Sequence, residues 1–394
     1  MGFYANGQKK IINILYGSKY DDVLDSSAEF IEKEIAPSAA NIDKEKVSPK
    51  GNLERLAQQG MIASHFPDKY GSLALPYPVH IAILEMVSKA CASTGVSMAI
   101  HNTCCEGFRL YGTKKQKEKY LTSLIGTGNI AAFCLTETSG GTNIFSNMKT
   151  VAKKEQDGYV INGSKTFITN AGLASVYIVF AKLEDKVTMF LVDKDTPGLS
   201  FSKPFDKDCV RGSVTCEVFF DGCKIPKENL LGKEGGGSSY CIEMLNKGRV
   251  GIATLAVGIS QAAFEKSIYY ATTRNAKGSP IADLQLIQKK IASMACGIDA
   301  ARLLTYHAAS VSGEYFSRMA NEAKLFASKT ALECAVESKY IHAAHGCMAE
   351  SNIERHLRDV WVTLIGEGTV EILEQTVSRL LVKEYQKSPG LSFW

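Results

Sequence analysis

Four short polar segments, three of which contain glycine, are the clearest places in this 394-residue chain where chemistry could occur. They are TETSGGTN, KTFITN, LGKEGGG and GEGT, at 136–143, 165–170, 231–237 and 366–369. In the last segment glycines flank a glutamate, and glycine lets a ligand and the backbone approach closely. Ordinary turn chemistry explains each segment about as well as function does, so the residues alone leave the ligand open.

The usual mechanistic fingerprints are absent from the sequence. There is no GxGxxG that opens a helix after a strand, no GxxxxGK[ST], no HExxH and no GxSxG. Of the seven histidines only His342 and His345 lie within one turn, and no carboxylate or cysteine joins them at ligand spacing. We therefore expect no metal site.

Composition bounds the function without naming it. Hydrophobic residues make up 45% of the chain, which is ample for a large core and excludes a disordered protein. The net charge of +4 is too small to indicate a protein that coats nucleic acid. No run is long enough to cross a membrane, and the first twenty residues lack a signal-peptide pattern. The 11 scattered cysteines, with no CxxC pair, predict a soluble protein of the reducing cytoplasm.

The elements that must position these segments change character along the chain. Up to about residue 130 helical spacing predominates, with helices expected at 22–36, ending at Pro37, and at 52–59 and 80–92. From 131 to 235 short β-branched and aromatic runs alternate with turn residues and predict an antiparallel β domain. Its expected strands are 159–170, 176–183, 187–195 and 214–222.

The remainder of the chain predicts a helical bundle. Proline is almost absent after Gly237, and one apolar seam recurs at steps of three and four residues, formed by Leu284, Ile287, Ile291, Met294 and Ile298. We therefore expect three domains, at 1–130, 131–235 and 236–394, in an α+β fold.

A series of motifs in this order resembles a known family. They are Pro67-x-x-Tyr70-Gly71, Gly112-Thr113-x-x-Gln116-Lys117-x-x-Tyr120-Leu121, Thr136-Glu137, Phe167-Ile168-Thr169-Asn170, Pro226-x-Glu228-Asn229-x-Leu231-Gly232, Arg249, Arg274, Gln285, HAAHG, Arg358-Asp359 and Glu367-Gly368-Thr369. From about residue 22 to 385 the chain resembles an acyl-CoA dehydrogenase. The resemblance implies a helical N-terminal domain, an antiparallel β domain and a C-terminal four-helix bundle.

The same resemblance implies a reaction and a base. An acyl-CoA dehydrogenase removes a weakly acidic Cα proton while a hydride leaves Cβ for FAD, giving a trans-2-enoyl-CoA. Burial must raise the basicity of the carboxylate that takes the proton. The matching position is Glu367, which we expect to be the catalytic base. Some relatives carry the base just before the arginine at Arg249, but that place is Gly248 here.

Binding residues carry over by position. FAD contacts are expected at Phe133, Leu135, Thr136, Thr142, Phe167, Ile168, Thr169, Thr369 and Glu371, and from a neighbouring subunit at Arg274, Gln285, Ile341, His342, Ala343 and Ala344. Substrate contacts are expected at Thr142, Asn246, Arg249 and Gly368. The implied partners are an acyl-CoA, an electron-transfer flavoprotein and further copies of the chain in a homotetramer, a dimer of dimers, in fatty acid metabolism.

Several positions depart from the family's usual residues. Phe167 stands for tryptophan, Ala343-Ala344 for two glycines, and Lys277 for phenylalanine. Gly366 replaces a bulky tyrosine just before the base, so we expect a wider pocket that accepts a branched or bulky acyl group.

Two other functions stay open at this point. One is an oxidase or monooxygenase of the same fold that passes electrons to oxygen. The other is a noncatalytic member of the fold that binds nucleic acid or a protein partner. Glu367 and the near-neutral charge count against the second. Acyl length, and whether the carrier is coenzyme A or an acyl carrier protein, also stay open.

Overall fold

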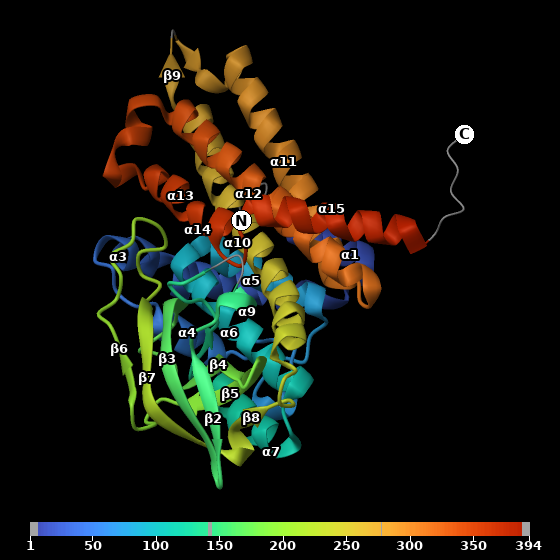
Figure 1. The fold of residues 1–394 in the computed structure, drawn as a ribbon. Helices are drawn as coiled ribbons and strands as arrows, with labels where there is room; N and C mark the ends of the chain where they lie inside the picture. Colours follow the sequence, from blue (N-terminus) through green and yellow to red (C-terminus); the bar gives the residue numbers. More distant parts are fainter. Residues whose placement is uncertain (1–6, 141–143, 277, 388–394) are drawn as a thin grey trace. The chain divides into compact units, whose positions relative to one another are not determined.

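The chain forms two compact units, shown in a computed structural model that describes residues 7–140, 144–276 and 278–387 (Figure 1). The first unit joins residues 1–21 to 249–394, and the second spans 22–248. Helix α10 (Gly237–Thr273) contains the boundary. A division into three domains near residues 130 and 235 stays a prediction.

The second unit begins with helices. They are α2 (Asp21–Phe30), α3 (Ala39–Lys44), α4 (Lys50–Gln58), α5 (Tyr77–Ala90), α6 (Ala92–Tyr111), α7 (Lys114–Gln116) and α8 (Thr122–Gly126). The helices expected at 52–59 and 80–92 are confirmed as α4 and α5, and the one expected at 22–36 begins as α2. The expected stop at Pro37 is wrong. A π-helical turn, Ile31–Ile35, and a 3-10 turn, Ala36–Ser38, carry the chain from α2 into α3. Proline fits there because the first residues of a helical turn need no intrahelical N–H donor.

A mixed β-sheet forms the rest of this unit. Its strands are β1 (Ala131–Cys134), β2 (Val151–Glu155), β3 (Gly158–Thr169), β4 (Val176–Leu183), β5 (Lys186–Asp193), β6 (Leu199–Phe201), β7 (Thr215–Pro226) and β8 (Leu230–Leu231), with the short helix α9 (Ile144–Asn147) after β1. The order is β6-β7-β3-β2-β4-β5-β8, and β1 pairs with β4. The four expected strands are confirmed as β3, β4, β5 and β7.

Strand direction departs from the expected antiparallel pattern at two places. β1 and β2 both run parallel to β4, whereas the other pairs are antiparallel. Neither parallel pair is joined by a tight hairpin, so turn geometry does not force these strands to be antiparallel. One face of the sheet covers a core that includes Ile161, Tyr177, Phe190 and Val218.

The first unit is helical. Besides α1 (Gly7–Tyr16) and the C-terminal part of α10 it contains α11 (Gln285–Ser310), α12 (Glu314–His342), α13 (Ile353–Asp359), α14 (Trp361–Ile365) and α15 (Val370–Lys387), and a small hairpin of β9 (Asn275–Ala276) and β10 (Ser279–Pro280). α11 packs along α12 and also against α1. The predicted seam is buried at Met294 and Ile298, whereas Leu284 is 47% exposed.

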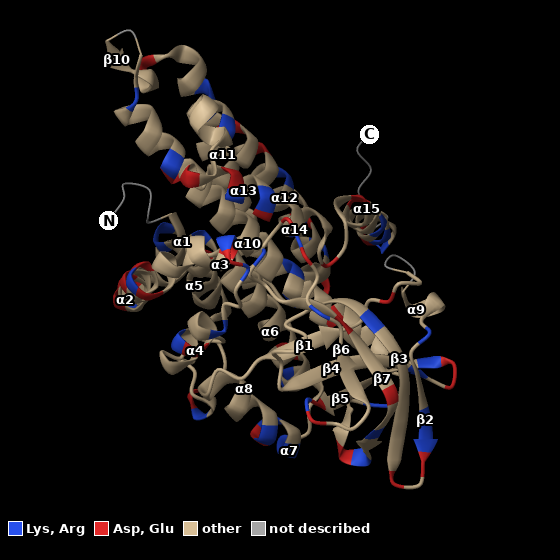
Figure 2. Cartoon of the chain, turned by 90° about the vertical axis from the view of Figure 1, so that its left-hand side faces the viewer, with Lys and Arg blue, Asp and Glu red and all other residues tan. Residues whose placement is uncertain are grey.

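Charged residues of both signs are interspersed on the long helices of the first unit. Figure 2 shows lysine, arginine and acidic residues together along α11, α12 and α15. Among the described helices, none combines the length and the apolar character needed to cross a membrane.

Candidate active site

The glutamate of the GEGT segment lies in a tight loop between α14 and α15. Glu367 has φ 56° and Gly368 has φ 105°, so two consecutive residues adopt left-handed backbone conformations. Glycine takes this conformation readily, but a glutamate there stores backbone strain of about 1–3 kcal/mol. Such strain persists only where neighbouring groups hold the backbone.

One oxygen of the Glu367 carboxylate is buried without a hydrogen-bonding partner. The residue as a whole is half-buried, but its Oε2 atom is buried and has no partner among the described residues. Burial raises the pKa of this carboxyl to about 7, against opposing effects of Arg249 and Lys324. A carboxylate of this kind is a stronger base than one in water and can accept a proton near neutral pH.

Two cations next to this loop bind its backbone. Arg249, on α10, donates from Nε to the carbonyl oxygen of Glu367 at 3.3 Å. Lys324, on α12, donates from Nζ to the carbonyl oxygen of the next residue, Gly368. The two donors therefore hold consecutive carbonyls of the strained loop and leave Oε2 of the carboxylate unpaired.

Sequence reasoning missed Lys324. Its side chain is fully buried, and burial lowers its pKa to about 7. The signal was its phase on α12, because Lys324 lies four residues after Ala320 and three before Ala327, and all three are buried. A lysine in phase with a stripe of small apolar residues is rarely a solvated one.

Gly366, the glycine before Glu367, has a local structural reason. A Cβ atom at Gly366 would lie 2.9 Å from the carbonyl oxygen of Val362, closer than real side chains approach. Backbone packing therefore suffices to explain glycine at this position, and a wider pocket beside the base stays a prediction.

Most of the flavin contacts predicted for the β domain lie at one end of β1 and β3. Phe167 is at an irregularity in the pairing of β3 with β7, has φ 57°, and is 66% exposed. The N–H of Thr166 donates to the carbonyl of Thr136 at 2.9 Å, which joins the segment after β1 to β3. Phe133, Thr136 and Thr169 are half-buried, Leu135 and Ile168 are buried, and Thr142 lies outside the described residues.

A buried ion pair supports this end of the sheet. Glu137 accepts hydrogen bonds from Nζ of Lys165 at 2.8 Å and from the backbone N–H of Lys149 and Thr150 at 2.6 and 3.0 Å. Lys165 also donates to the carbonyl of Leu135 at 3.0 Å. Burial acts to raise the pKa of Glu137, yet the hydrogen bonds bring it down to about 2.

The predicted residues of the first unit lie on several of its elements. Arg274 is exposed beside the β9–β10 hairpin, and Gln285 is exposed at the start of α11. At the end of α12, Ile341 and His342 are buried whereas Ala343, with φ 49°, and Ala344 are exposed. Thr369 and Glu371 adjoin the Glu367 loop, and Asn246, in the second unit, is buried on α10.

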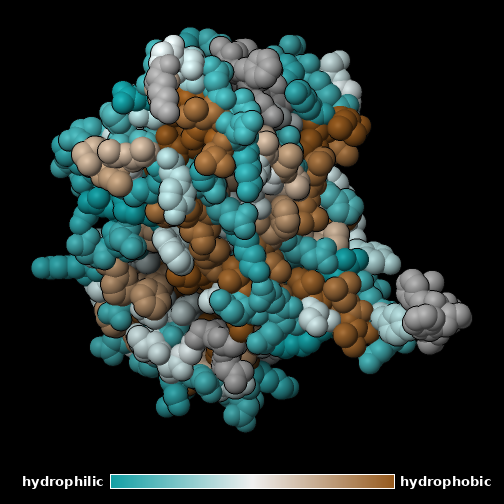
Figure 3. Space-filling model, turned by 90° about the horizontal axis from the view of Figure 1, so that it is seen from above, coloured by the Kyte–Doolittle hydropathy of each residue, from teal (hydrophilic) through white to brown (hydrophobic). Residues whose placement is uncertain are grey.

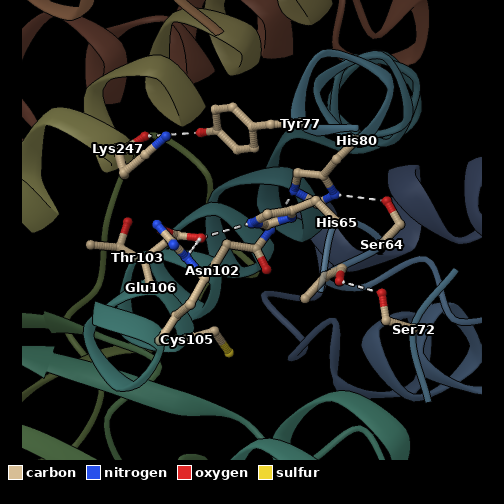
Figure 4. Close-up of polar contacts among 12 residues, drawn as sticks. Ser64, His65, Ser72, Tyr77, His80, Asn102, Thr103, Cys105, Glu106 and Lys247 are labelled. Atoms are coloured by element: carbon tan, nitrogen blue, oxygen red, sulfur yellow. Dashed lines mark hydrogen bonds and ion pairs between the residues drawn. The ribbon is translucent and has the colours of Figure 1, made fainter. Parts of the chain in front are cut away.

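A further buried polar cluster lies among α5, α6 and the start of α10 (Figure 4). Nε2 of His65 contacts the Glu106 carboxylate at 2.9 Å, and Arg109 binds the same carboxylate at 2.6 Å. The pKa of Glu106, which burial alone would raise, is brought to about 2 by His65 and Arg109. The ammonium of Lys247 lies 4.4 Å from the Tyr77 ring centre. Among the described residues, no group of three or more His, Cys, Asp or Glu could hold a metal ion.

Comparison with family models decides the assignment of the chain. Models of the N-terminal, middle and C-terminal acyl-CoA dehydrogenase domains match residues 18–127, 132–223 and 235–382. The chain belongs to the acyl-CoA dehydrogenase family. The predicted family and fold are confirmed. The predicted enzyme class, an acyl-CoA dehydrogenase, and its cofactor, FAD, are confirmed as well.

Individual acyl-CoA dehydrogenases resemble the chain over most of its length. The human mitochondrial short-chain specific acyl-CoA dehydrogenase is 37% identical over 92% of this chain and 90% of its own. The butyryl-CoA dehydrogenase structure from Megasphaera elsdenii is 35% identical, covers 92% of this chain and 97% of its own, and has a TM-score of 0.88.

Other solved structures with the same fold include chains from flavoprotein systems. A chain in the structure of the electron transferring flavoprotein of Acidaminococcus fermentans has 34% identity and a TM-score of 0.89, and the match covers 97% of this chain and 100% of that one. An acyl-CoA dehydrogenase from Bacillus anthracis complexed with FAD has 29% identity and a TM-score of 0.88, covering 95% of this chain and 68% of its own.

Proposed function

We propose that this acyl-CoA dehydrogenase converts a short-chain acyl-CoA into its trans-2-enoyl-CoA, with Glu367 as the base that removes the Cα proton. The observation that supports this most strongly is the buried, unpartnered Oε2 of Glu367 together with the raised pKa of its carboxyl, about 7. A short acyl group follows from the similarity to short-chain and butyryl-CoA dehydrogenases.

The residues assigned to FAD have the chemistry that a flavin needs. Phe167 offers an exposed aromatic ring on a left-handed bulge, and the hydroxyls of Thr136 and Thr169 lie on the segments that meet beside it. Aromatic faces and short polar groups suit a planar, hydrogen-bonding ring system. When bound, FAD supplies the acceptor for the hydride that leaves Cβ. Leu135 and Ile168 are buried, so we assign contact by their backbone atoms only.

The pyrophosphate and adenosine of FAD are assigned to a neighbouring subunit's Arg274, Gln285 and residues 341–344. Arg274 and Gln285 are exposed and suit this role, since a guanidinium binds phosphate oxygens through two parallel hydrogen bonds. Thr369 and Glu371 adjoin Glu367, and we assign them to FAD as well. For the substrate we assign Asn246, Arg249, Gly368 and Thr142.

A homotetramer is the assembly we propose. The first unit exposes several large apolar side chains: Tyr269, Leu284, Leu286, Leu303, Tyr340 and Trp361. Figure 3 shows patches of hydrophobic residues on one face of the molecule. Contiguous exposed apolar patches often mark protein interfaces.

The electron acceptor we propose is an electron-transfer flavoprotein, supported by the similar chain in the Acidaminococcus fermentans structure. An oxidase is the second candidate, because the prolyl acyl carrier protein oxidase AnaB shares the fold at 29% identity and a TM-score of 0.89, over 93% of this chain and 99% of that one. Hydrogen peroxide formed in air with each turnover would favour the oxidase.

All 11 cysteines are free thiols, which supports a location in the reducing cytoplasm. We assign the enzyme to fatty acid metabolism.

One experiment tests the base and the reaction together. The yellow holoprotein is titrated anaerobically with butyryl-CoA, and the loss of flavin absorbance is followed in wild type and Glu367→Gln. We expect bleaching in wild type and a rate about 10² to 10⁴ times lower in the variant, with butyryl-CoA binding retained. Glu374→Gln, an exposed neighbour on α15, is the matched control and should bleach as wild type does. Full bleaching in Glu367→Gln would exclude Glu367 as the base. No bleaching by any acyl-CoA from butyryl to longer or branched chains would exclude the dehydrogenase reaction itself.

A further inference from the structure

One face of α12 binds both α14 and the loop after it, which contains Glu367. The hydroxyl of Ser328 donates to the carbonyl of Thr363, on α14, at 2.8 Å. Four residues earlier, Lys324 donates to the carbonyl of Gly368. Residues four apart lie on the same face of a helix, so these two donors act side by side on consecutive parts of the same segment.

A buried lysine at this position is not explained by packing. Lys324 and Ser328 are both fully buried. Transferring an ammonium group from water into a protein costs several kcal/mol, and an apolar side chain of similar volume is often tolerated better. The amine is therefore present for what it donates to, and its acceptor is the carbonyl of the residue next to the proposed base.

We propose that Lys324 is a positioning residue for Glu367: by binding the carbonyl of Gly368 it holds the left-handed Glu367–Gly368 loop and so keeps Oε2 of the carboxylate unpaired. The inference rests on the proposed role of Glu367 as the base. Nζ of Lys324 and Nε of Arg249 both donate to backbone carbonyls of the loop. A carbonyl is a neutral acceptor, so the loop is fixed without neutralising the base.

The charges around the loop determine in which direction the pKa of Glu367 should change when Lys324 is replaced. The charged groups that face Lys324 are Glu367 on the loop, Arg249 on α10 and Glu371 on α15. Those that face Glu367 are Arg249 and Lys324, and both lower the carboxyl pKa that burial raises. Removing the ammonium of Lys324 should therefore raise the pKa of Glu367 further.

The test separates the hydrogen bond from the charge. Lys324→Met removes both, whereas Lys324→Gln keeps an N–H donor and removes only the charge. Lys329→Met, on the same helix but in an exposed ion pair with Glu374, is the matched control. The rate of flavin reduction by butyryl-CoA is measured anaerobically in each holoprotein between pH 6 and 9, together with the butyryl-CoA dissociation constant.

A structural readout accompanies the rates. Infrared difference spectra of wild type minus Glu367→Gln report the protonation of the Glu367 carboxyl as a function of pH. For each lysine variant, the spectrum of the same variant with Glu367→Gln added is subtracted in the same way. In Lys324→Met we expect reduction about 10 to 100 times slower, unchanged butyryl-CoA binding, and a carboxyl midpoint raised by about one pH unit. In Lys324→Gln we expect much of the rate at high pH to return while the midpoint stays raised. Lys329→Met should match wild type in reduction rate, in butyryl-CoA binding and in the carboxyl midpoint.

Two results would overturn the inference. One is a wild-type reduction rate and a wild-type carboxyl midpoint in both Lys324→Met and Lys324→Gln. The other is a loss of flavin or of thermal stability in Lys324→Met with no change of midpoint in Lys324→Gln, since a purely structural lysine would behave that way. Failure of the base assignment is recognised separately, because Glu367→Gln itself would then bleach at the wild-type rate. If Lys324→Met does not fold, the midpoint in Lys324→Gln decides.

Discussion

Two carboxylates with nearby cations, one in each unit, have opposite properties. Glu137, in the second unit, accepts hydrogen bonds from Lys165 and two backbone N–H groups, and its pKa is about 2. Glu367, in the first unit, is also near two cations, yet burial raises its pKa to about 7. The difference is not in the number of positive charges nearby.

What differs is the acceptor that the cations use. At Glu137 the ammonium of Lys165 binds the carboxylate itself, whereas at Glu367 the two cations bind backbone carbonyls. A hydrogen bond to the charged form favours that form, but a charge that is merely near compensates burial only in part. The first arrangement stabilises the charged form of the carboxylate, and the second leaves the pKa of Glu367 raised, as its proposed role as a base requires.

Breaking the paired carboxylate should have the largest effect on stability. Lys165→Met leaves Glu137 buried without its cation, and removal of one partner of a buried pair costs about 3–5 kcal/mol. We expect the free energy of unfolding, measured by urea denaturation at pH 7, to fall by that amount. A loss below about 1 kcal/mol would mean that the two backbone N–H groups alone satisfy Glu137.

Stability against pH should change in opposite directions at the two glutamates. The folded-state pKa of Glu367 lies above its unfolded value, so its contribution to stability is lost as the pH rises from about 4.5 through 7. Glu367→Gln should therefore be more stable than wild type at pH 8, by at most about 3 kcal/mol, and equally stable near pH 4.5.

Glu137 provides the opposite case. Its folded-state pKa lies below the unfolded value, so its contribution is present above about pH 4.5 and is lost as the pH falls toward 2. Glu137→Gln should be less stable than wild type at pH 7, and the difference should shrink in acid. Urea titrations over a range of pH measure the free energy of unfolding of both variants. The protein concentration is kept fixed, because an oligomer's stability depends on concentration. Parallel pH profiles for the two variants would contradict the contrast.

The sequence could predict most of the elements and the proposed base, but not the arrangement around Glu367. Alternating apolar residues and turn chemistry suffice for β3 and β4, and the GEGT motif indicates Glu367. The role of Lys324 depends on a contact with Gly368, 44 residues away in the chain, and no local pattern encodes such an approach. The left-handed φ of Glu367 is also unpredictable, since residues other than glycine rarely adopt it. Likewise, Pro37 ends helices by propensity, but here a π-helical turn before it carries the chain on.

Removing the charge of Arg249 should have an intermediate effect on the base. Arg249 is the charged group that lowers the pKa of Glu367 most, ahead of Lys324. In Arg249→Gln we expect the pH midpoint of flavin reduction by butyryl-CoA to rise by about one unit, and by more than in Lys324→Gln. Because Arg249 is also assigned to the substrate, the dissociation constant of butyryl-CoA is measured in parallel. A midpoint that falls or stays constant would show that the arginine does not act on the carboxylate.

The smallest effect should come from an ion pair of the same kind at the surface of the same sheet. Lys154, on β2, contacts the Glu234 carboxylate at 2.7 Å, but these side chains are 60% and 37% exposed, whereas Lys165 is fully buried. Water screens an exposed pair and solvates either partner when the other is removed, so such pairs contribute about 0–1 kcal/mol. Lys154→Met should therefore lower the free energy of unfolding by less than about 1 kcal/mol, and 1 M NaCl should abolish the difference. A loss as large as that of Lys165→Met would mean that charge pairing alone, and not burial, accounts for the contribution of the Lys165–Glu137 pair.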